Sequence, residues 1–258
     1  MTVHTSVLSA AGFDPVGPVF GTTVMDVGWT GGASCGWRPT YPSRRGPAVA
    51  LPPRPAGHTA YARALRGGRD TALDRMCRAA GALGADGVVA VRFTEQRLAG
   101  RTREFRALGV AVRSRGRQRP GAVFSTELAA PEFVTLLAAG WVPAGIVRGL
   151  AVAVRHEDWR TASSLGFLVP NTELAGHTEL ITHVRAEARR DVAARAAALG
   201  ADAVLTSGLR SAMWATGAGE DHTDQVAECV VTGTAVARFH PGHPPSSSPT
   251  VLPLRSTR

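Results

Sequence analysis

The side chains best suited to hold a metal ion gather in one short acidic segment near the end of the chain. The segment Glu220-Asp221-His222-Thr223-Asp224 combines carboxylates with an imidazole. Oxygen and nitrogen donors bind metal ions when several of them converge. Asp221, His222 and Asp224 are therefore the candidate metal ligands, although a solvated acidic turn is the interpretation that we favour for this segment.

The cysteines and the other paired histidines are weaker candidates for metal binding. Cys35, Cys77 and Cys229 are an odd number of scattered thiols, which is typical of a reducing compartment and not of a disulfide framework. We expect Cys77 and Cys229 to be small buried residues. His177 and His183 are six positions apart, so on a helix they point to different faces.

A second candidate site is a dense arginine segment. All 29 basic residues are arginine, and eight of them lie in Arg97–Arg119 with Glu104 as the single acid. Clustered guanidinium groups neutralise phosphates, which predicts salt-dependent binding to nucleic acid. Phe105 is the one aromatic residue among them. The candidate nucleic-acid contacts are Arg101, Arg103, Arg106, Arg113, Arg115 and Arg117.

The elements that would position these residues occur twice, because three sequence blocks recur in the same order. The offsets between the copies are 128, 116 and 124 residues, so the copies differ in loop length. A residue that carries chemistry in each copy should appear in both. The paired blocks are Ala10–Gly21 with Ala138–Gly149, Leu83–Asp86 with Leu199–Asp202, and Gly109–Val112 with Gly233–Val236.

Hydrophobic periodicity predicts a β-α-β-β order in each copy. Gly84 and Gly200 should end the two helices, and we expect Gly67-Gly68 to break the first turn of the first helix, with Asp70 as its cap. The expected elements of the first copy are Pro15 to Trp29, a helix from Leu65 to Leu83, Val88 to Thr94 and Glu104 to Arg113. Those of the second copy are Val142 to Arg155, Glu179 to Leu199, Ala203 to Leu209 and Gln225 to Phe239.

These blocks resemble the YbjQ family. The resemblance rests on Gly17-Pro18-Val19-Phe20-Gly21, on Leu-Gly-Ala-Asp at the end of each helix, on Gly87–Val91, and on Gly233-Thr234-Ala235-Val236. It implies an α+β fold of two tandem β-α-β-β units, similar to dodecin subunits, that forms rings; single-copy members assemble as pentamers. It also implies a role in binding a divalent or heavy metal or a small ligand, without a ligand set that can be carried over to this sequence.

The expected domain organisation follows from the repeat and from local composition. We assign residues 1–120 to the first unit, with a Gly/Pro-rich insertion at 30–57, and residues 121–140 to a connecting helix. The second unit covers 141–240, and the proline- and serine-rich residues 241–258 form a disordered tail.

The sequence does not favour an enzyme. It lacks a nucleophile elbow, a phosphate loop and a dinucleotide fingerprint. The carboxylates that recur, Asp86 with Asp202 and Glu104 with Glu228, have no partnered base or nucleophile beside them in the pattern. We expect Asp86 and Asp202 to be structural turn residues.

Charge and hydropathy indicate the partners and the compartment. The second copy is acidic over 220–228 where the first is basic, so the two hairpins could meet across an interface; we favour this over nucleic acid and keep both. No apolar run is long enough to span a bilayer, and no signal peptide is visible. We expect a cytoplasmic protein that binds copies of itself and no membrane.

Overall fold

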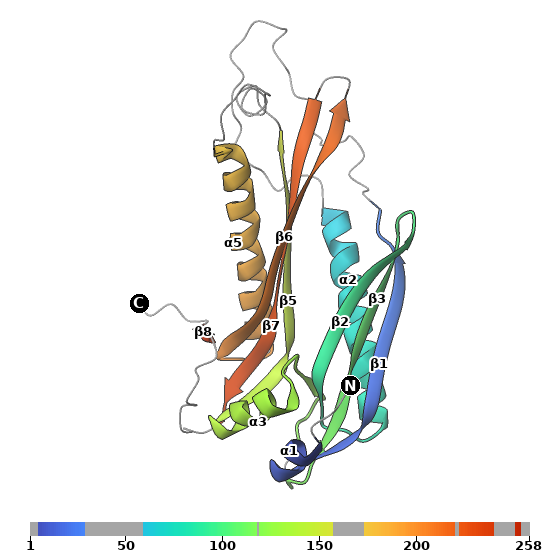
Figure 1. The fold of residues 1–258 in the computed structure, drawn as a ribbon, viewed down its shortest axis with the longest axis vertical. Helices are drawn as coiled ribbons and strands as arrows, with labels where there is room; N and C mark the ends of the chain where they lie inside the picture. Colours follow the sequence, from blue (N-terminus) through green and yellow to red (C-terminus); the bar gives the residue numbers. More distant parts are fainter. Residues whose placement is uncertain are drawn as a thin grey trace, which may run out of the picture.

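The computed structural model describes residues 5–28, 59–117, 119–156, 173–219, 222–239 and 251–253, and shows two α+β units (Figure 1). The prediction of two tandem β-α-β-β units is confirmed. The first unit contains β1 (Phe13–Asp26), α2 (Thr59–Ala82), β2 (Gly87–Ala99) and β3 (Thr102–Ser114). The second contains β5 (Trp141–His156), α5 (Ala175–Ala198), β6 (Ala203–Gly219) and β7 (His222–Arg238). Short elements flank them: α1 (Thr5–Ala10), β4 (Phe124–Ser125), α3 (Ala130–Ala138) and β8 (Val251–Pro253).

The two sheets have the same strand order. The first is β1-β3-β2-β4 and the second is β5-β7-β6-β8. The main strands are antiparallel, and the short strand β4 runs parallel to β2. A register shift between Pro15 and Gly17 in β1 recurs between Pro143 and Gly145 in β5, so the copies correspond at the level of single residues.

Both long helices end by the same backbone device. Gly84 and Gly200 have φ values of 68° and 67°, in the left-handed region that glycine adopts without steric penalty. The next residue, Ala85 or Ala201, donates its N–H to a carbonyl near the end of its helix, at 3.1 Å in each case. The expected helix stops are therefore present in both copies.

The aspartates that follow these glycines are structural residues, as predicted. Asp86 is buried, and its Oδ2 accepts a hydrogen bond from the backbone N–H of Ser114 at 2.8 Å. Asp202 Oδ2 accepts the corresponding bond from Arg238 at 3.0 Å. Each carboxylate thereby joins the turn after the helix to the end of the partner strand.

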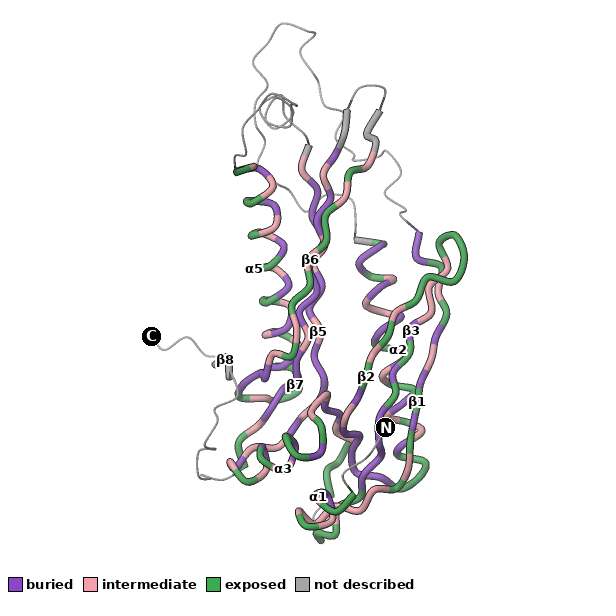
Figure 2. The backbone as a smooth tube through the Cα atoms, in the orientation of Figure 1, coloured by how far each residue is buried: buried purple, intermediate pink, exposed green. Residues whose placement is uncertain are grey.

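The long helices α2 and α5 each cover one face of the sheet in their own unit. The first unit covers the face of β5, β7 and β6 that lies opposite α5. One residue in two along β7 packs toward α5, where Cys229 and Val231 belong to an apolar cluster with Leu180 and Val184. Figure 1 shows α5 on one side of β5, β6 and β7 and the first unit on the other. Figure 2 shows the resulting long buried stretches along β5 and β7.

Two expectations about local structure are wrong. Gly67-Gly68 do not break the first helix, because α2 runs without interruption from Thr59 to Ala82. Close packing favours glycine at position 68: a Cβ there would lie 2.5 Å from the ring of Phe105. The tail is not wholly without regular structure, since β8 pairs with β6. The insertion at 30–57 lies outside the described residues.

We predict that Gly67→Ala and Gly68→Ala change stability in opposite directions. Both replacements favour the helix by up to about 1 kcal/mol, and a Cβ at Gly67 meets nothing within 4 Å. At Gly68 the Cβ meets Phe105 and the sulfur of Met25, so overpacking of about 1–3 kcal/mol should dominate. Urea denaturation followed by circular dichroism checks this, and equal effects at both positions would contradict the packing argument.

Candidate functional site: the junction between the two units

The structure does not assemble the predicted metal ligands into a described site. Asp224 is buried in β7, where it lies opposite His156 of β5 and Thr216 of β6. His222 is the first residue of β7, and Asp221 lies outside the described residues. Across the described part of the chain, no group of three or more His, Cys, Asp and Glu side chains converges.

The thiols do not supply a metal site either. Cys229 is fully buried in the core beneath α5, as predicted. Cys77 is half-buried, and burial, with Asp74 nearby, raises the pKa of its thiol to about 11. Because metal ions bind the thiolate, burial makes Cys77 a weaker ligand, and among the described residues it belongs to no group of three or more possible ligands.

The predicted arginine cluster is largely paired within the first unit. Arg101 forms an ion pair with Asp26 at 2.5 Å, and Arg115 forms one with Asp14 at 2.5 Å. Arg113 donates to the carbonyl oxygens of Leu83 and Gly84 at the end of α2. These contacts stabilise the turns at both ends of the first sheet.

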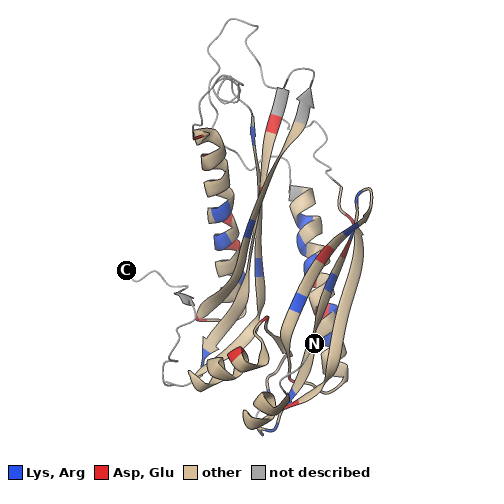
Figure 3. Ribbon diagram, viewed as in Figure 1, with Lys and Arg blue, Asp and Glu red and all other residues tan. Residues whose placement is uncertain are grey.

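The remaining candidate arginines follow a similar pattern. Arg103 pairs with Glu95 at 2.6 Å, and Arg106 lies 3.4 Å from Glu104; Arg117 is exposed. Figure 3 shows basic and acidic residues interspersed along β2 and β3. The partners of the paired arginines belong to the first unit and not to the acidic hairpin of the second, so the structure offers no contact for the predicted hairpin complementarity among the described residues.

The structure instead brings polar groups together at the junction between the two units. The apolar part of this junction joins Leu65 and Phe105 of the first unit to Leu150 and Val230 of the second. Tyr61 of α2 donates from its hydroxyl to Glu228 of β7 at 3.1 Å. Burial and the charge of Glu228 raise the pKa of Tyr61 to about 12, so this hydroxyl keeps its proton as a donor at neutral pH.

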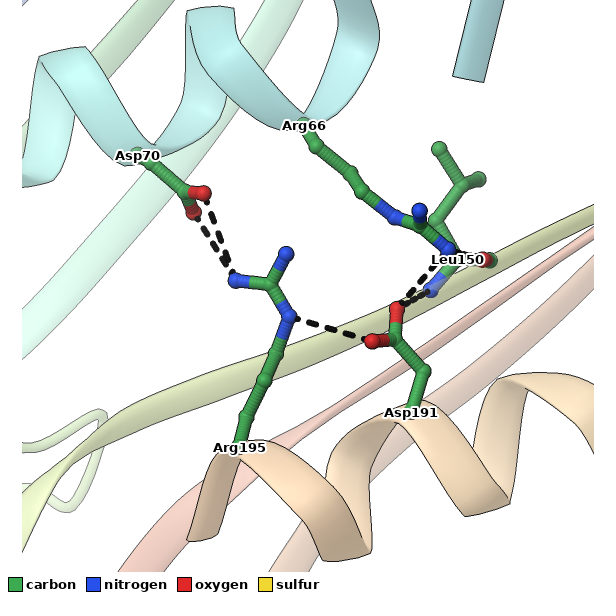
Figure 4. A network of polar contacts seen from close by, with 5 residues as sticks. All are labelled: Arg66, Asp70, Leu150, Asp191 and Arg195. Atoms are coloured by element: carbon green, nitrogen blue, oxygen red, sulfur yellow. Dashed lines mark hydrogen bonds and ion pairs between the residues drawn. The ribbon is translucent and has the colours of Figure 1, made fainter. Parts of the chain in front are cut away.

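A network of charges joins α2 to α5 around the edge strand β5 (Figure 4). Asp191 of α5 accepts from the backbone N–H of Leu150 at 3.0 Å and pairs with Arg66 of α2 at 3.1 Å. Arg66 also donates to the carbonyl oxygen of Leu150 at 2.5 Å. Arg195 links Asp191 to Asp70, at 3.3 Å to each carboxylate. One backbone position of β5 is thus held from both helices.

A cavity of about 600 Å³ lies between β2 and the sheet of the second unit. Arg69 of α2 and Arg148 of β5 both line it, and Arg69 pairs with Glu95 at 2.7 Å. Arg148 lies 3.8 Å above the ring of Phe93 and donates to Glu127 at 3.1 Å. A smaller cavity of about 370 Å³ shares both arginines.

The charges in this cleft shift one another's pKa values. Burial alone would raise the pKa of Glu95, but Arg69 and Arg103 outweigh it and hold that pKa below its usual value. Burial lowers the pKa of Arg148; Glu127 opposes this shift and Arg69 adds to it. An arginine stays protonated at neutral pH, so two like charges lie in one partly buried wall.

Sequence reasoning missed Arg69, Arg148, Glu95 and Glu127. Their positions in the chain are far apart. Two of them do not recur between the copies, because the residue equivalent to Arg148 is Phe20, at the offset of 128, and the one equivalent to Glu95 is Ser211, at the offset of 116. Only the docking of unlike faces from the two copies brings them together. The signal that could have found them is the exchange of an apolar residue for arginine within the repeated strand.

The fold and this cleft define a class of protein: a tandem α+β repeat whose two copies pack with unlike faces and enclose an arginine-lined cavity. Among the described residues, no helix combines the length and the apolar character that crossing a bilayer requires.

Comparison with known proteins gives the family. The chain belongs to the YbjQ family, whose model carries the description "Putative heavy-metal-binding" and matches residues 56–115 and 142–238. The resemblance seen in the sequence is thereby confirmed for both copies. A UPF0145 protein of Halorubrum lacusprofundi (strain ATCC 49239 / DSM 5036 / JCM 8891 / ACAM 34) is 49% identical over 55 residues, which are 21% of this chain and 53% of that protein. The match thus spans about half the length of that relative.

We predict that Asp191→Ala lowers the free energy of unfolding by about 1–3 kcal/mol, because it removes the ion-pair partner of Arg66 and the acceptor of the Leu150 N–H. Glu187→Ala is the matched control on the same helix, since its pair with Arg190 is more exposed and should contribute less than about 1 kcal/mol. Urea denaturation measures both, and an equal loss in the two variants would contradict a special role for the network.

We predict that Cys77 reacts slowly with iodoacetamide at neutral pH. A pKa near 11 instead of the ordinary 9.0 leaves roughly a hundredfold less thiolate at about pH 8 than an unperturbed thiol has. Mass spectrometry of a Cys35→Ser background gives the rate, with Cys77→Ser as the blank. The rate should rise as the pH approaches 11; alkylation at the speed of a free thiol would contradict the burial argument.

Proposed function

We propose that this protein is a non-enzymatic, cytoplasmic, self-assembling protein whose chains join head to tail into a ring by repeating the interface that its own two units make. The observation that carries this proposal is that the interface joins unlike faces. The first unit contributes α2 and β2, and the second contributes the sheet face of β5 and β7. Each chain therefore retains two faces that the intrachain interface does not use: a sheet face on the first unit, and a face of helix and edge strand on the second unit.

The unused sheet face lies on the first unit. Its residues correspond by register to residues of the second unit that are partly buried at the junction: Phe20 to Arg148, Val24 to Val152 and Leu108 to Thr232. In the first unit these side chains are exposed, at 70%, 55% and 43%. A large aromatic residue left this open on a sheet indicates a surface that a partner covers.

The unused helix-and-edge face lies on the second unit. Leu209 of β6 corresponds to Phe93 of β2 at the offset of 116, and Phe93 supports Arg148 across the junction. Leu209 is 41% exposed, and Met213 on the same strand is also exposed. Both faces thus present apolar side chains at the positions that the intrachain interface uses.

A second copy of this chain is the partner that fits both faces at once. An interface between unlike faces leads to a closed ring when its rotation closes and to an open filament when it does not. The family resemblance supports closure, because it implies pentameric rings for single-copy members. A ring of tandem chains would alternate first and second units and so would hold an even number of units, ten in a pentamer of chains.

We predict that Phe20→Glu dissociates the assembly. A carboxylate placed at the centre of an apolar contact must lose its hydration without a partner, which weakens the association by several kcal/mol. Native mass spectrometry at low salt compares it with the parent chain. Leu83→Glu is the control, because Leu83 is also a large exposed apolar residue, 47% accessible, at the end of α2 and outside both proposed faces.

An oligomer in the parent chain and in Leu83→Glu, with a smaller species in Phe20→Glu, supports the proposal. A monomeric parent chain overturns it. The same spectra report any retained metal, which is the direct measure of the heavy-metal role that the family description suggests; a metal adduct lost on replacing Asp221 and Asp224 would assign that role to the acidic turn.

A further inference from the structure

The cavity at the junction carries more positive than negative charge. Four arginines and two glutamates line it, so its side chains have a net charge of +2. It is bounded on one side by β2 and on the other by residues of β5, β6 and β7. The charged lining residues are Arg69, Arg92, Arg148, Arg210, Glu95 and Glu127.

Arg69 is the most deeply placed of these charges and is incompletely paired. It is 5% exposed, and one of its terminal nitrogens donates to Glu95 at 2.7 Å. Its Nε and Nη1 atoms are buried and have no acceptor among the described residues. Buried donors of a charged group are costly to leave unsatisfied, so this guanidinium lacks an acceptor that a ligand could supply.

The carboxylates of the cavity are already engaged and do not supply that acceptor. Glu95 accepts from Arg69 and from Arg103. Glu127 accepts from Arg148 and from the hydroxyl of Ser207. Two neighbouring guanidinium groups therefore share one wall with their nearest carboxylates committed, and a bound anion would relieve their repulsion.

The rest of the lining indicates what accompanies the anion. Arg92 and Arg210 are exposed residues of the lining, so an incoming negative charge can meet them. Phe93, Val91 and Val230 are apolar residues of the lining. A pocket with a few convergent polar groups beside apolar surface is typical of small-molecule sites.

We propose that this cavity binds a small molecule through its oxyanion group, a carboxylate or a phosphate, with Arg69 and Arg148 as the inner contacts and Arg92 and Arg210 as the exposed contacts. Guanidinium groups match both anions in geometry and charge. This inference rests on the proposed non-enzymatic function and adds a small-molecule ligand to it. The site lies within one chain and does not depend on assembly.

The second copy does not build the same site within the chain. Arg185 corresponds to Arg69 at the offset of 116 but is exposed and donates to Ser211. Phe20 stands where the second unit has Arg148. Divergence of the two copies thus concentrates the arginines at the intrachain junction.

Isothermal titration calorimetry at low salt tests the site with two probes, inorganic phosphate and benzoate, on the full chain. We expect saturable binding of at least one probe that weakens as salt is added. Arg92→Ala/Arg210→Ala should weaken it by about tenfold or more, since it removes two cationic groups from the exposed part of the lining. Arg115→Ala/Arg117→Ala removes the same charge far from the cavity and should bind as the parent does.

The inner contact is tested with Arg69→Met, which leaves Glu95 paired with Arg103 and so avoids a buried carboxylate without a partner. Circular dichroism verifies folding, and loss of binding in the folded variant supports the proposal. Binding of phosphate alone or of benzoate alone identifies the anion. No saturable binding of either probe to the parent chain, or equal binding by the parent chain, the Arg92→Ala/Arg210→Ala variant and the Arg69→Met variant, overturns it.

Binding that persists in Phe20→Glu shows that the site is independent of assembly. If Phe20→Glu binds as the parent does while the oligomer is lost, both proposals stand. If the parent chain is monomeric yet binds the anion, the ligand site stands and the assembly proposal fails.

Discussion

The interaction on which this structure depends is the contact by which the first unit covers the apolar sheet face of the second unit that lies opposite α5. In the second unit α5 packs on one side of β7, and the alternate residues of the same strand still need cover. The first unit provides it through Leu65, Phe105 and Tyr61. Burial of this face fixes how the two copies sit, because apolar area removed from water is the dominant favourable term in such contacts.

The polar groups of the junction follow from that docking. The edge strand β5 comes to lie between two helices, and Asp191, Arg66 and Arg195 pair across it (Figure 4). Arg148, on the covered face, meets Phe93 of the other unit instead of water. The cavity lies where the surfaces of the two units are not in contact. Its net charge is set by the residues that line it in each copy.

Duplication explains why the chain has both a used and an unused version of each face. Gly21 and Gly149 show how closely the copies agree inside: a Cβ at either would lie about 2 Å from a helix carbonyl, of Ala72 or of Ala188. The outer faces have diverged, as Phe20 and Arg148 show. Close packing constrains the residues in the interior of each unit. The surface residues are less constrained, so they can differ between the copies and form different contacts.

The sequence by itself determined the elements within each copy. Periodicity, Gly84 and Gly200 placed the helices, and the repeat predicted the same β-α-β-β order of elements along each copy, because these signals act through neighbouring residues. Tertiary structure decided the continuity of α2, where Phe105 leaves room only for a glycine at position 68. It also decided the pairing of the arginines. It alone decided the cleft, since Arg69 and Arg148 meet only when two distant faces pack, and contacts between unlike surfaces leave no periodic pattern in the chain.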